Sequence, residues 1–340
     1  MMIKLSVIIP TRNRASLLLA TLESILHQTY DQKLFEVIVC DNNSTDNIAE
    51  IAHYFTDKFQ HFRYIKTLEP GLHIGRNKGF QEAKGEILVY IDDDIEAFPE
   101  WLETINDVFK EKDVVLVGGK NLPKWEIAPP DWALEMWKPN NDGDRMTGSF
   151  SIIDLGNQIK EINPYYVFGC NFSIRKNIIA ETQGFHPDGM PQEIIEYRGD
   201  GESYVSGYIK QRGYKTIYHP QASVYHLVTK ERLTIEYLWK RGFNQGVSDS
   251  FTSIRNPKIP SHKKVINLKL ILKGVLRSMF KFFKNKPPET IIEVSIYYKA
   301  MDEGHKEGFC FHQQKVEESP ELKAWVMKDN YLLWNQNIFY

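Results

Sequence analysis

The strongest constraint on the fold is an alternation of short apolar runs with segments of helical periodicity near the start of the chain. The apolar runs span residues 5–9, 35–40, 62–65 and 87–91, and they predict strands, the first stopped by Pro10. The helical segments between them span residues 14–28, 44–59 and 74–84. This alternation predicts βαβ units, and the unbroken apolar runs predict a parallel sheet buried on both faces.

The pattern changes after residue 118. Residues 118–165 are rich in Gly, Pro, Asn and Trp and predict loops or short antiparallel strands. Further strands are predicted at 166–175, 215–218 and 223–226, a helix at 201–212, and mostly helix from 230 onward. We expect an α/β, Rossmann-like fold: a mostly parallel central sheet flanked by helices, with a C-terminal helical extension. Two Pro-containing pairs near residue 255 suggest a catalytic domain at 1–255 and an extension at 256–340.

Composition narrows the class of protein. With 340 residues, 42% hydrophobic and 25% charged, the chain has ordinary globular usage, which excludes disordered and collagen-like proteins. The three cysteines are far apart and show no metal-finger spacing, so reduced thiols and a cytoplasmic location are expected. The apolar run before Pro10 is too short for a signal peptide, and no run is long enough to span a bilayer.

The charge is unevenly distributed around a net value of −2. Between Asp249 and Glu289 there is no acidic residue, while Lys and Arg recur. Residues 263–285 place their basic residues in one stripe of an amphipathic helix, which suits peripheral docking on the anionic inner face of the plasma membrane. The alternative is a helix packed on the catalytic domain with a solvated basic edge. Nucleic acid is a disfavoured partner because no nucleic-acid motif is present.

The feature richest in chemistry is Asp92-Asp93-Asp94, directly after the strand at 87–91. Ligands of open α/β sheets bind beyond the carboxyl ends of the strands. Three adjacent carboxylates repel one another, so a divalent cation such as Mg²⁺ or Mn²⁺ is the natural compensation. A solvated acidic turn is the alternative.

Polar residues also come after the other strands. Asp41 can accept hydrogen bonds from a nucleobase or ribose, and Ser44–Asp46 can cap the next helix. The segment 10–14 carries arginines but no glycine cradle, which disfavours dinucleotide and P-loop sites. The helix start at 75–79 suits a phosphate group.

Together four segments resemble the family-2 glycosyltransferases of the GT-A fold. They are Ser6-Val-Ile-Ile-Pro-Thr-Arg-Asn-Arg14, Val39-Cys-Asp-Asn-Asn-Ser-Thr-Asp46, Gly75-Arg-Asn-Lys-Gly79 and Tyr90-Ile-Asp-Asp-Asp94. The resemblance covers about residues 3–240. It implies a nucleotide-sugar donor, foremost a UDP-sugar, Mn²⁺ or Mg²⁺ as cofactor, and an inverting transfer. The implied acceptor is a hydroxyl of a saccharide or lipid-linked saccharide, in polysaccharide biosynthesis for a bacterial cell envelope.

The resemblance also implies roles for individual residues. Those implied for the nucleotide-sugar site are Pro10, Thr11, Arg14, Asp41, Asn43, Arg76, Asp92, Asp93, Gly169 and Asn171. Those implied for the metal are Asp94, Asp92 and His226, although a lone His also serves structural roles. Arg232 and Arg241 lie where they can close over the diphosphate.

An inverting transfer needs a general base for the acceptor hydroxyl. The family offers a Glu-Asp pair about eleven residues before a glycine that ends a helix. Counting back from Gly213 leads to Glu202, with Asp200 as the alternative base. Both also suit the ordinary role of a carboxylate near a helix N-terminus.

Two other classes of protein are alternatives. A sugar-nucleotide pyrophosphorylase would need a glycine-rich basic loop after the first strand, which residues 10–14 lack. A non-catalytic, membrane-associated carbohydrate-binding or scaffold protein would have no need of the three aspartates and Glu202.

Overall fold

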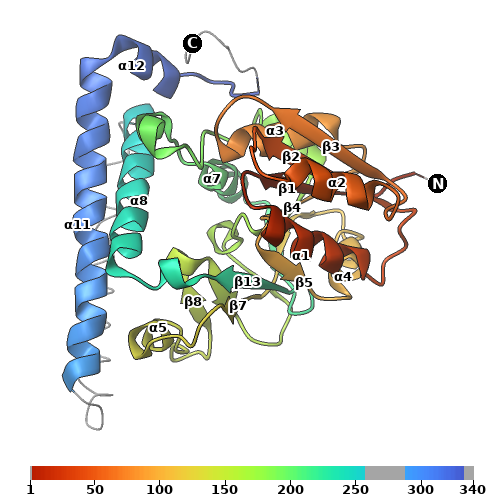
Figure 1. The fold of residues 1–340 in the computed structure, drawn as a ribbon, viewed down its shortest axis with the longest axis horizontal. Helices are drawn as coiled ribbons and strands as arrows, with labels where there is room; N and C mark the ends of the chain where they lie inside the picture. Colours follow the sequence, from red (N-terminus) through yellow and green to blue (C-terminus); the bar gives the residue numbers. More distant parts are fainter. Residues whose placement is uncertain (1, 257–287, 333–340) are drawn as a thin grey trace.

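The computed structural model describes residues 2–256 and 288–332 (Figure 1). The basic segment predicted to form a helix at 263–285 lies outside the described residues. Among the helices that are described, none combines the length and the apolar character needed to cross a bilayer.

A central sheet of eight strands runs in the order β10-β12-β6-β11-β4-β1-β2-β3. Its strands are β1 (Leu5–Thr11), β2 (Phe35–Asn42), β3 (Phe62–Thr67), β4 (Ile87–Ile91), β6 (Val114–Gly118), β10 (Lys160–Glu161), β11 (Asn171–Arg175) and β12 (Lys215–Tyr218). β1 pairs in parallel with β2 and β4, β2 with β3, and β12 with β6. β11 is antiparallel to both of its neighbours, and β10 to β12. The expected mostly parallel α/β sheet is confirmed.

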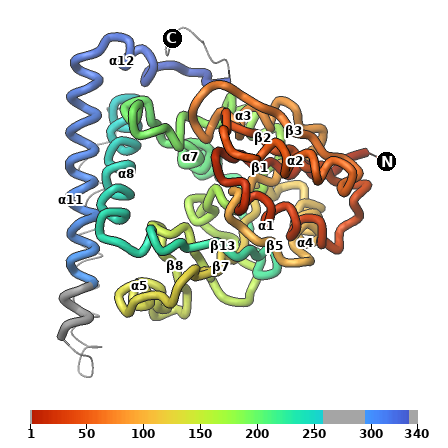
Figure 2. Tube along the Cα trace, in the orientation of Figure 1, coloured from red at the N-terminus to blue at the C-terminus, as the bar shows by residue number. Residues whose placement is uncertain are grey.

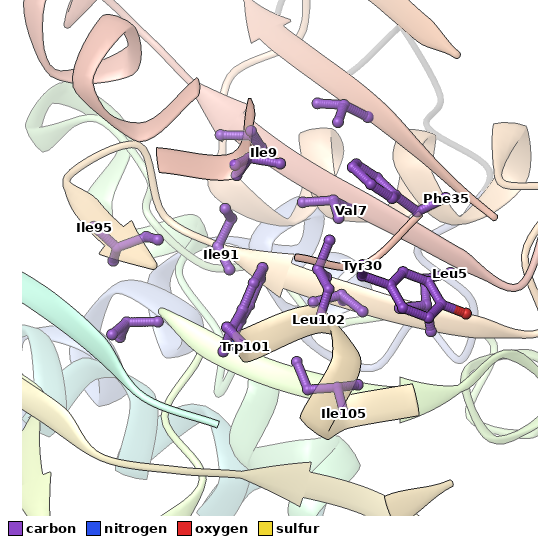
Figure 3. Close-up of a cluster of buried hydrophobic side chains, with 14 of the residues drawn as sticks. Leu5, Val7, Ile9, Tyr30, Phe35, Ile91, Ile95, Trp101, Leu102 and Ile105 are labelled. Atoms are coloured by element: carbon purple, nitrogen blue, oxygen red, sulfur yellow. The ribbon is translucent and has the colours of Figure 1, made fainter. Parts of the chain in front are cut away.

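Helices cover both faces of this sheet. One face packs on α1 (Ala15–Leu26), α2 (Ile48–Thr56) and α4 (Trp101–Val108), and the other on α3 (Leu72–Glu82), α6 (Lys176–Glu181) and α7 (Glu202–Arg212). Val7 and Ile9 belong to the first core, shown in Figure 3, while Ile8 belongs to the second. This alternation along β1 explains why its apolar run is unbroken.

Two expected element boundaries were wrong. β1 does not stop at Pro10 but continues to Thr11. Pro10 has no backbone N–H to donate, which costs little stability here because the hydrogen-bonded pairing of β1 with β4 already ends at Ile8. α2 begins at Ile48, so Ser44 is not its N-cap. The Ser44 amide instead donates to Asp41 Oδ1 at 2.8 Å, which holds the loop in a turn before the helix.

A second sheet extends the molecule beside the first, in the order β5-β13-β7-β9-β8. Its strands are β5 (Ile95–Ala97), β7 (Asn121–Trp125), β8 (Arg145–Thr147), β9 (Ile152–Asp154) and β13 (Val224–Val228). The region 118–165 thus contains the expected short strands, but also a helix, α5 (Asp131–Met136), and a parallel β7–β13 pair that its composition did not indicate. Asp92–Asp94 form the turn between β4 and β5, where the two sheets meet.

The described C-terminal region is helical, as expected. α8 (Ile235–Arg255) and α11 (Pro288–Glu318) lie side by side along one edge of the molecule, and α12 (Pro320–Val326) turns back toward the sheet (Figures 1 and 2). Glycines let the two long helices approach closely: a Cβ on Gly246 would lie 2.1 Å from the carbonyl oxygen of His305. Gly304 and Gly308 make the same kind of contact from α11.

Candidate active site

The carboxyl ends of β1, β2 and β4 meet at one edge of the central sheet. Thr11 at the end of β1 is in register with Asp41 of β2, and Asp92 comes directly after the end of β4. A hydrogen bond connects the loops after β1 and β2: the backbone N–H of Asn13 donates to Ser44 Oγ at 2.9 Å. The sheet therefore gathers the polar segments that the sequence places after separate strands.

Asp93 and Asp94 are buried and share one arginine. Arg14 lies 2.8 Å from Asp93 Oδ1 and 2.6 Å from Asp94 Oδ2, and Thr11 Oγ1 donates to Asp93 at 2.7 Å. Burial raises the pKa of Asp93 to about 7, against the opposing effect of Arg14. Asp93 and Asp94 therefore form a buried ion cluster with Arg14, which contradicts the alternative of a solvated turn for these two residues.

Asp94 has a second cation and an imidazole beside it. Arg232 Nη2 lies 2.7 Å from Asp94 Oδ2, and His226 Nε2 lies 3.4 Å from Asp94 Oδ1. Burial raises the pKa of Asp94, but His226, Arg14 and Arg232 lower it by more, so the net shift is downward. His226 Nδ1 lies 2.8 Å from the Phe150 carbonyl oxygen. Nδ1 therefore carries the proton, and Nε2 is an acceptor with Arg232 Nη1 at 3.3 Å.

Asp41 is buried at the end of β2, and both of its oxygens accept hydrogen bonds. The donors are the Ser44 amide at 2.8 Å and the Tyr64 hydroxyl at 2.5 Å. Asn43, next to it, has a positive φ of 59°, a conformation that Asn tolerates better than most residues. Asp41 thus shapes this loop as well as lying at the sheet edge.

Arg76 connects three carboxylates from different parts of the chain. Its side chain, only 3% exposed, lies 3.0 Å from Glu202, 3.6 Å from Asp92 and 3.9 Å from Asp188. Burial lowers the pKa of Arg76, but these carboxylates raise it by more, so the guanidinium stays charged. A Cβ on Gly169 would lie 2.3 Å from Arg76 Nη2, so only glycine leaves room for this arrangement.

Asp200 and Glu202, the two predicted bases, are in different environments. Asp200 Oδ1 contacts His186 Nδ1 at 2.6 Å, and Asp200 Oδ2 accepts from Thr252 Oγ1 at 2.8 Å. Glu202 begins α7 and its side chain is 29% exposed. Asp200 is therefore committed to contacts within the protein through both oxygens, whereas Glu202 keeps part of its surface open.

Two adjoining cavities meet at Glu202. The polar cavity, of about 520 Å³, is lined by Arg76, Asp92, Gly169, Asp188 and Asp200 among others. The methionine cavity, of about 570 Å³, takes its apolar wall from Met136, Met146 and Met301, together with Tyr298. Glu202 and Arg241 line both. Glu202 thus stands between a charged chamber and a mostly apolar one.

The remaining predicted residues lie around or beneath these cavities. Pro10 packs beside Gly75, where an added Cβ would lie 2.8 Å from Pro10 Cβ. Asn171 lies beneath the site: it is 1% exposed and its side chain bonds to Trp101, Asn121 and the Ala222 backbone. Sequence reasoning missed Asp188, which pairs with Arg198 at 2.6 Å, and Cys170, which lines the polar cavity. No local pattern marks either residue.

A mostly parallel sheet with an acidic triplet at its carboxyl edge, beside a polar cavity and a carboxylate at a helix start, is the arrangement of a GT-A glycosyltransferase. Residues 6–182 match the sequence model of the family described as "Glycosyl transferase family 2", which is more than half of the chain. The chain belongs to this family. It is a glycosyltransferase that uses a nucleotide-sugar donor.

Named relatives extend this comparison. A glucosyl-dolichyl phosphate glucuronosyltransferase of Haloferax volcanii is 27% identical over 255 residues, 74% of this chain and 77% of the relative. A poly(ribitol-phosphate) beta-glucosyltransferase of Bacillus spizizenii is 22% identical over 333 residues, 94% of this chain but only 45% of the relative. The mannosyltransferase PcManGT of Pyrobaculum calidifontis, solved with GDP-Man and Mn²⁺, has a TM-score of 0.53 at 17% identity, covering 97% of this chain and 84% of that one. At that identity the likeness shows the fold alone.

Proposed function

We propose that the protein catalyses an inverting, metal-dependent transfer of a sugar from a nucleoside diphosphate sugar to an acceptor hydroxyl. A UDP-sugar is the expected donor, and a saccharide or lipid-linked saccharide the expected acceptor. The observation that carries the proposal is the convergence of Asp92, Arg76 and Glu202 in the polar cavity, with Glu202 also lining the methionine cavity. Membership in the family sets aside the pyrophosphorylase and the non-catalytic alternatives.

The acidic cluster fits a divalent cation such as Mn²⁺ or Mg²⁺. Asp92 Oδ1 and Asp94 Oδ1 are buried and, among the described residues, receive no hydrogen bond. His226 Nε2, an acceptor, lies 3.4 Å from Asp94 Oδ1 and 3.3 Å from Arg232 Nη1, which an ion would replace as its partner. Asp92, Asp94 and His226 would hold the ion, which supplies positive charge against the diphosphate leaving group. Carboxylate ligands suit Mg²⁺ and Mn²⁺.

Glu202 is the better candidate for the general base. It stands where the polar cavity meets the methionine cavity, and Arg76 Nη1 orients Oε2 from 3.0 Å. An acceptor hydroxyl entering from the methionine cavity would give its proton to Glu202 as it attacks the anomeric carbon. Asp200, held by His186 and Thr252, is assigned to positioning the loop that carries Glu202.

The remaining predicted residues would bind the donor. Asp41 and Asn43 lie at the end of β2, where the nucleoside would sit, and Thr11 and Pro10 lie at the end of β1. Cationic side chains surround the acidic cluster and would attract the diphosphate. They are Arg14, Arg76 and Arg232, with Arg241 lining both cavities.

The names of the relatives support a lipid-linked or polymeric acceptor. One is a glucosyl-dolichyl phosphate glucuronosyltransferase and the other a poly(ribitol-phosphate) beta-glucosyltransferase. The methionine cavity would receive such an acceptor beside Glu202. Contact of residues 263–285 with an anionic membrane stays a prediction, which co-sedimentation of the protein with anionic and neutral vesicles tests.

The test is release of nucleoside diphosphate from a panel of UDP-, GDP- and dTDP-sugars with Mn²⁺, using the wild type and Asp94→Ala. We expect metal-dependent release from one donor class, lost in the variant. Binding of nucleoside diphosphate without turnover would direct the search to an acceptor absent from the assay. Neither turnover nor binding with any donor would contradict the proposed function.

A further inference from the structure

A thiol stands beside the carboxylate and the imidazole of the proposed metal site. Oxygen, sulfur and nitrogen atoms of Asp92, Cys170 and His226 all lie within 4.8 Å of one another. The three residues come from the end of β4, the loop before β11 and strand β13. The sequence analysis found no metal-finger spacing among the cysteines and did not assign Cys170 to a metal.

A chain of hydrogen bonds determines what the sulfur of Cys170 can do. Trp101 Nε1, which can only donate, lies 3.0 Å from Asn171 Oδ1. The amide nitrogen of Asn171 therefore faces Asn121 Oδ1, at 3.1 Å. This leaves Asn121 Nδ2 to donate to Cys170 Sγ at 3.3 Å and to the Ser151 carbonyl oxygen at 3.2 Å. The orientation of both amides is set by one indole N–H, and the sulfur accepts from Asn121 while its own S–H faces the Ser151 carbonyl oxygen at 3.7 Å.

An amide that donates to sulfur is what a metal-bound thiolate needs. Groups behind a ligand orient it and compensate its charge, and their loss weakens metal affinity. Cys170 and Asn121 are 2% and 1% exposed, so this contact is shielded from water. The two other atoms of the cluster face arginines: Arg76 Nη2 lies 3.6 Å from Asp92 Oδ1, and Arg232 Nη1 lies 3.3 Å from His226 Nε2. Asp92 Oδ1 receives no hydrogen bond from the described residues, and His226 Nε2 is an acceptor because Nδ1 carries the proton, so both atoms have a lone pair that a cation can take in place of an arginine.

We propose that Cys170 is a sulfur ligand of the cation site, together with Asp92 and His226, and that the site therefore binds Zn²⁺ and other thiophilic ions. The inference rests on the metal site of the proposed function. Zinc takes Cys, His and carboxylate ligands, and three protein ligands leave one position open for substrate. The thiol proton leaves to solvent when the ion binds, since a coordinating thiol is deprotonated. Hard ions such as Mg²⁺ gain little from sulfur.

The experiment uses the full chain and metal ions alone, without donor. Co²⁺ serves as the spectroscopic probe because a Co²⁺–thiolate bond gives a charge-transfer absorption band in the near ultraviolet. The variants are Cys170→Ser, which keeps the size of the side chain, and Cys170→Ala. Cys310→Ser is the matched control, because Cys310 lies exposed on α11. Circular dichroism verifies that each variant is folded.

We expect the band in the wild type and in Cys310→Ser, and its absence in both Cys170 variants. The dissociation constant for Zn²⁺, from competition with Co²⁺, should rise about tenfold or more in Cys170→Ser. Binding of Mn²⁺, followed by its electron paramagnetic resonance signal, should change much less. Asn121→Ala should weaken Zn²⁺ binding while keeping the band.

Two outcomes would overturn the inference: no charge-transfer band in the wild type, or equal Zn²⁺ affinity in the wild type and Cys170→Ser. Cys170 would then be a structural core thiol. Either result leaves the proposed function intact if Mn²⁺-dependent transfer is still lost in Asp94→Ala. Failure of that transfer assay, in contrast, would remove the proposed function without bearing on the absorption band.

Discussion

At the scale of single residues, the site is organised by arginines that each hold more than one carboxylate. Arg14 spans Asp93 and Asp94, and Arg76 joins Asp92 to Glu202. Removing one partner of such a buried ion pair leaves an uncompensated charge. This destabilises the protein by far more than the intact ion pair stabilises it. Substitutions of the arginines therefore disturb folding and catalysis together, and conservative changes of the carboxylates separate the two better.

The roles of the two candidate bases can be separated by amide substitutions. Glu202→Gln should lower kcat about 10²- to 10⁴-fold, because the amide cannot accept the acceptor proton. Donor binding, measured by calorimetry, should be nearly unchanged. Asp200→Asn should cause a smaller loss, and Thr252→Val, which removes one contact of Asp200, should resemble it. A full loss in Asp200→Asn with activity retained in Glu202→Gln would make Asp200 the base.

At the scale of elements, glycines bring the backbones of helices α8 and α11 into direct contact. Backbone of Met301 and His305 lies where a Cβ on Gly242 or Gly246 would be, at 2.1 Å in each case. Such contact positions α11 against the catalytic part of the chain, and α11 contributes Tyr298 and Met301 to the methionine cavity.

Gly246→Ala should therefore destabilise the protein by about 1–3 kcal/mol, the usual cost of overpacking. Alanine gains about 1 kcal/mol over glycine in helix propensity, but a 2.1 Å contact with backbone forces the helices apart and outweighs it. Urea unfolding measures the change. Gly148→Ala is the control, since its Cβ would meet nothing within 4 Å, and equal stability losses in both would contradict the argument.

A buried histidine makes this helix pair sensitive to pH. His312 of α11 is fully buried and its Nδ1 lies 2.6 Å from Ser250 Oγ on α8. Burial lowers the pKa of His312 from 6.5 to about 4. As the pH falls, His312 therefore takes up a proton in the unfolded chain before it does so in the folded protein. Its contribution to the free energy of unfolding is fully present above pH 6.5 and is lost progressively as the pH falls toward 4.

We expect the free energy of unfolding to fall by up to about 3 kcal/mol from this residue across that range. Urea titrations between about pH 4 and 7 measure the slope. His312→Asn, which keeps a polar group facing Ser250 but does not titrate, should have a shallower slope in this window. An unchanged slope would assign the acid sensitivity to other groups, such as the buried His73, whose pKa burial lowers to about 3.

At the scale of the whole molecule, the C-terminal helices support the loop that carries the proposed base. The family match ends at residue 182, before Glu202. Arg255 of α8 donates to the backbone of Val326 and Lys328, and Trp325 Nε1 of α12 donates to the Tyr197 carbonyl at 3.0 Å. The acidic triplet and Arg76 therefore lie within the family match, whereas Glu202, His226 and Arg232 come from the part of the chain after residue 182.

Ligand binding should be visible in the stability of the whole protein. A nucleoside diphosphate with Mn²⁺, at about 100 times its dissociation constant, should raise the free energy of unfolding by about 2.7 kcal/mol. The cation offsets repulsion among the buried Asp93 and Asp94 carboxylates and Asp92 beside them. Thermal unfolding with and without a chelator measures the effect. If the chelator leaves the nucleotide-induced shift unchanged, donor binding does not require a metal.

The sequence alone determined the sheet and the place of the site. The unbroken apolar runs of β1, β2 and β4 required burial on both faces, and parallel strands then brought Thr11, Asp41 and Asp92 to one edge. These are consequences of local periodicity, which a single sequence displays. Local periodicity did not predict α5 or the β7–β13 pair, because the Gly, Pro and Trp residues in this region interrupt the alternation of apolar and polar residues.

Only the tertiary structure decided which charged groups meet. Arg76 and Glu202 are 126 positions apart and Arg232 and Asp94 are 138 apart, yet their closest atoms are 3.0 Å and 2.7 Å apart. Cys170 comes close to Asp92 and His226 in the same way. A charge that is buried away from water needs a partner of opposite charge. Which residue becomes that partner depends on how the helices and sheets pack against one another, not on distance along the chain. No short-range pattern in the sequence carries that information.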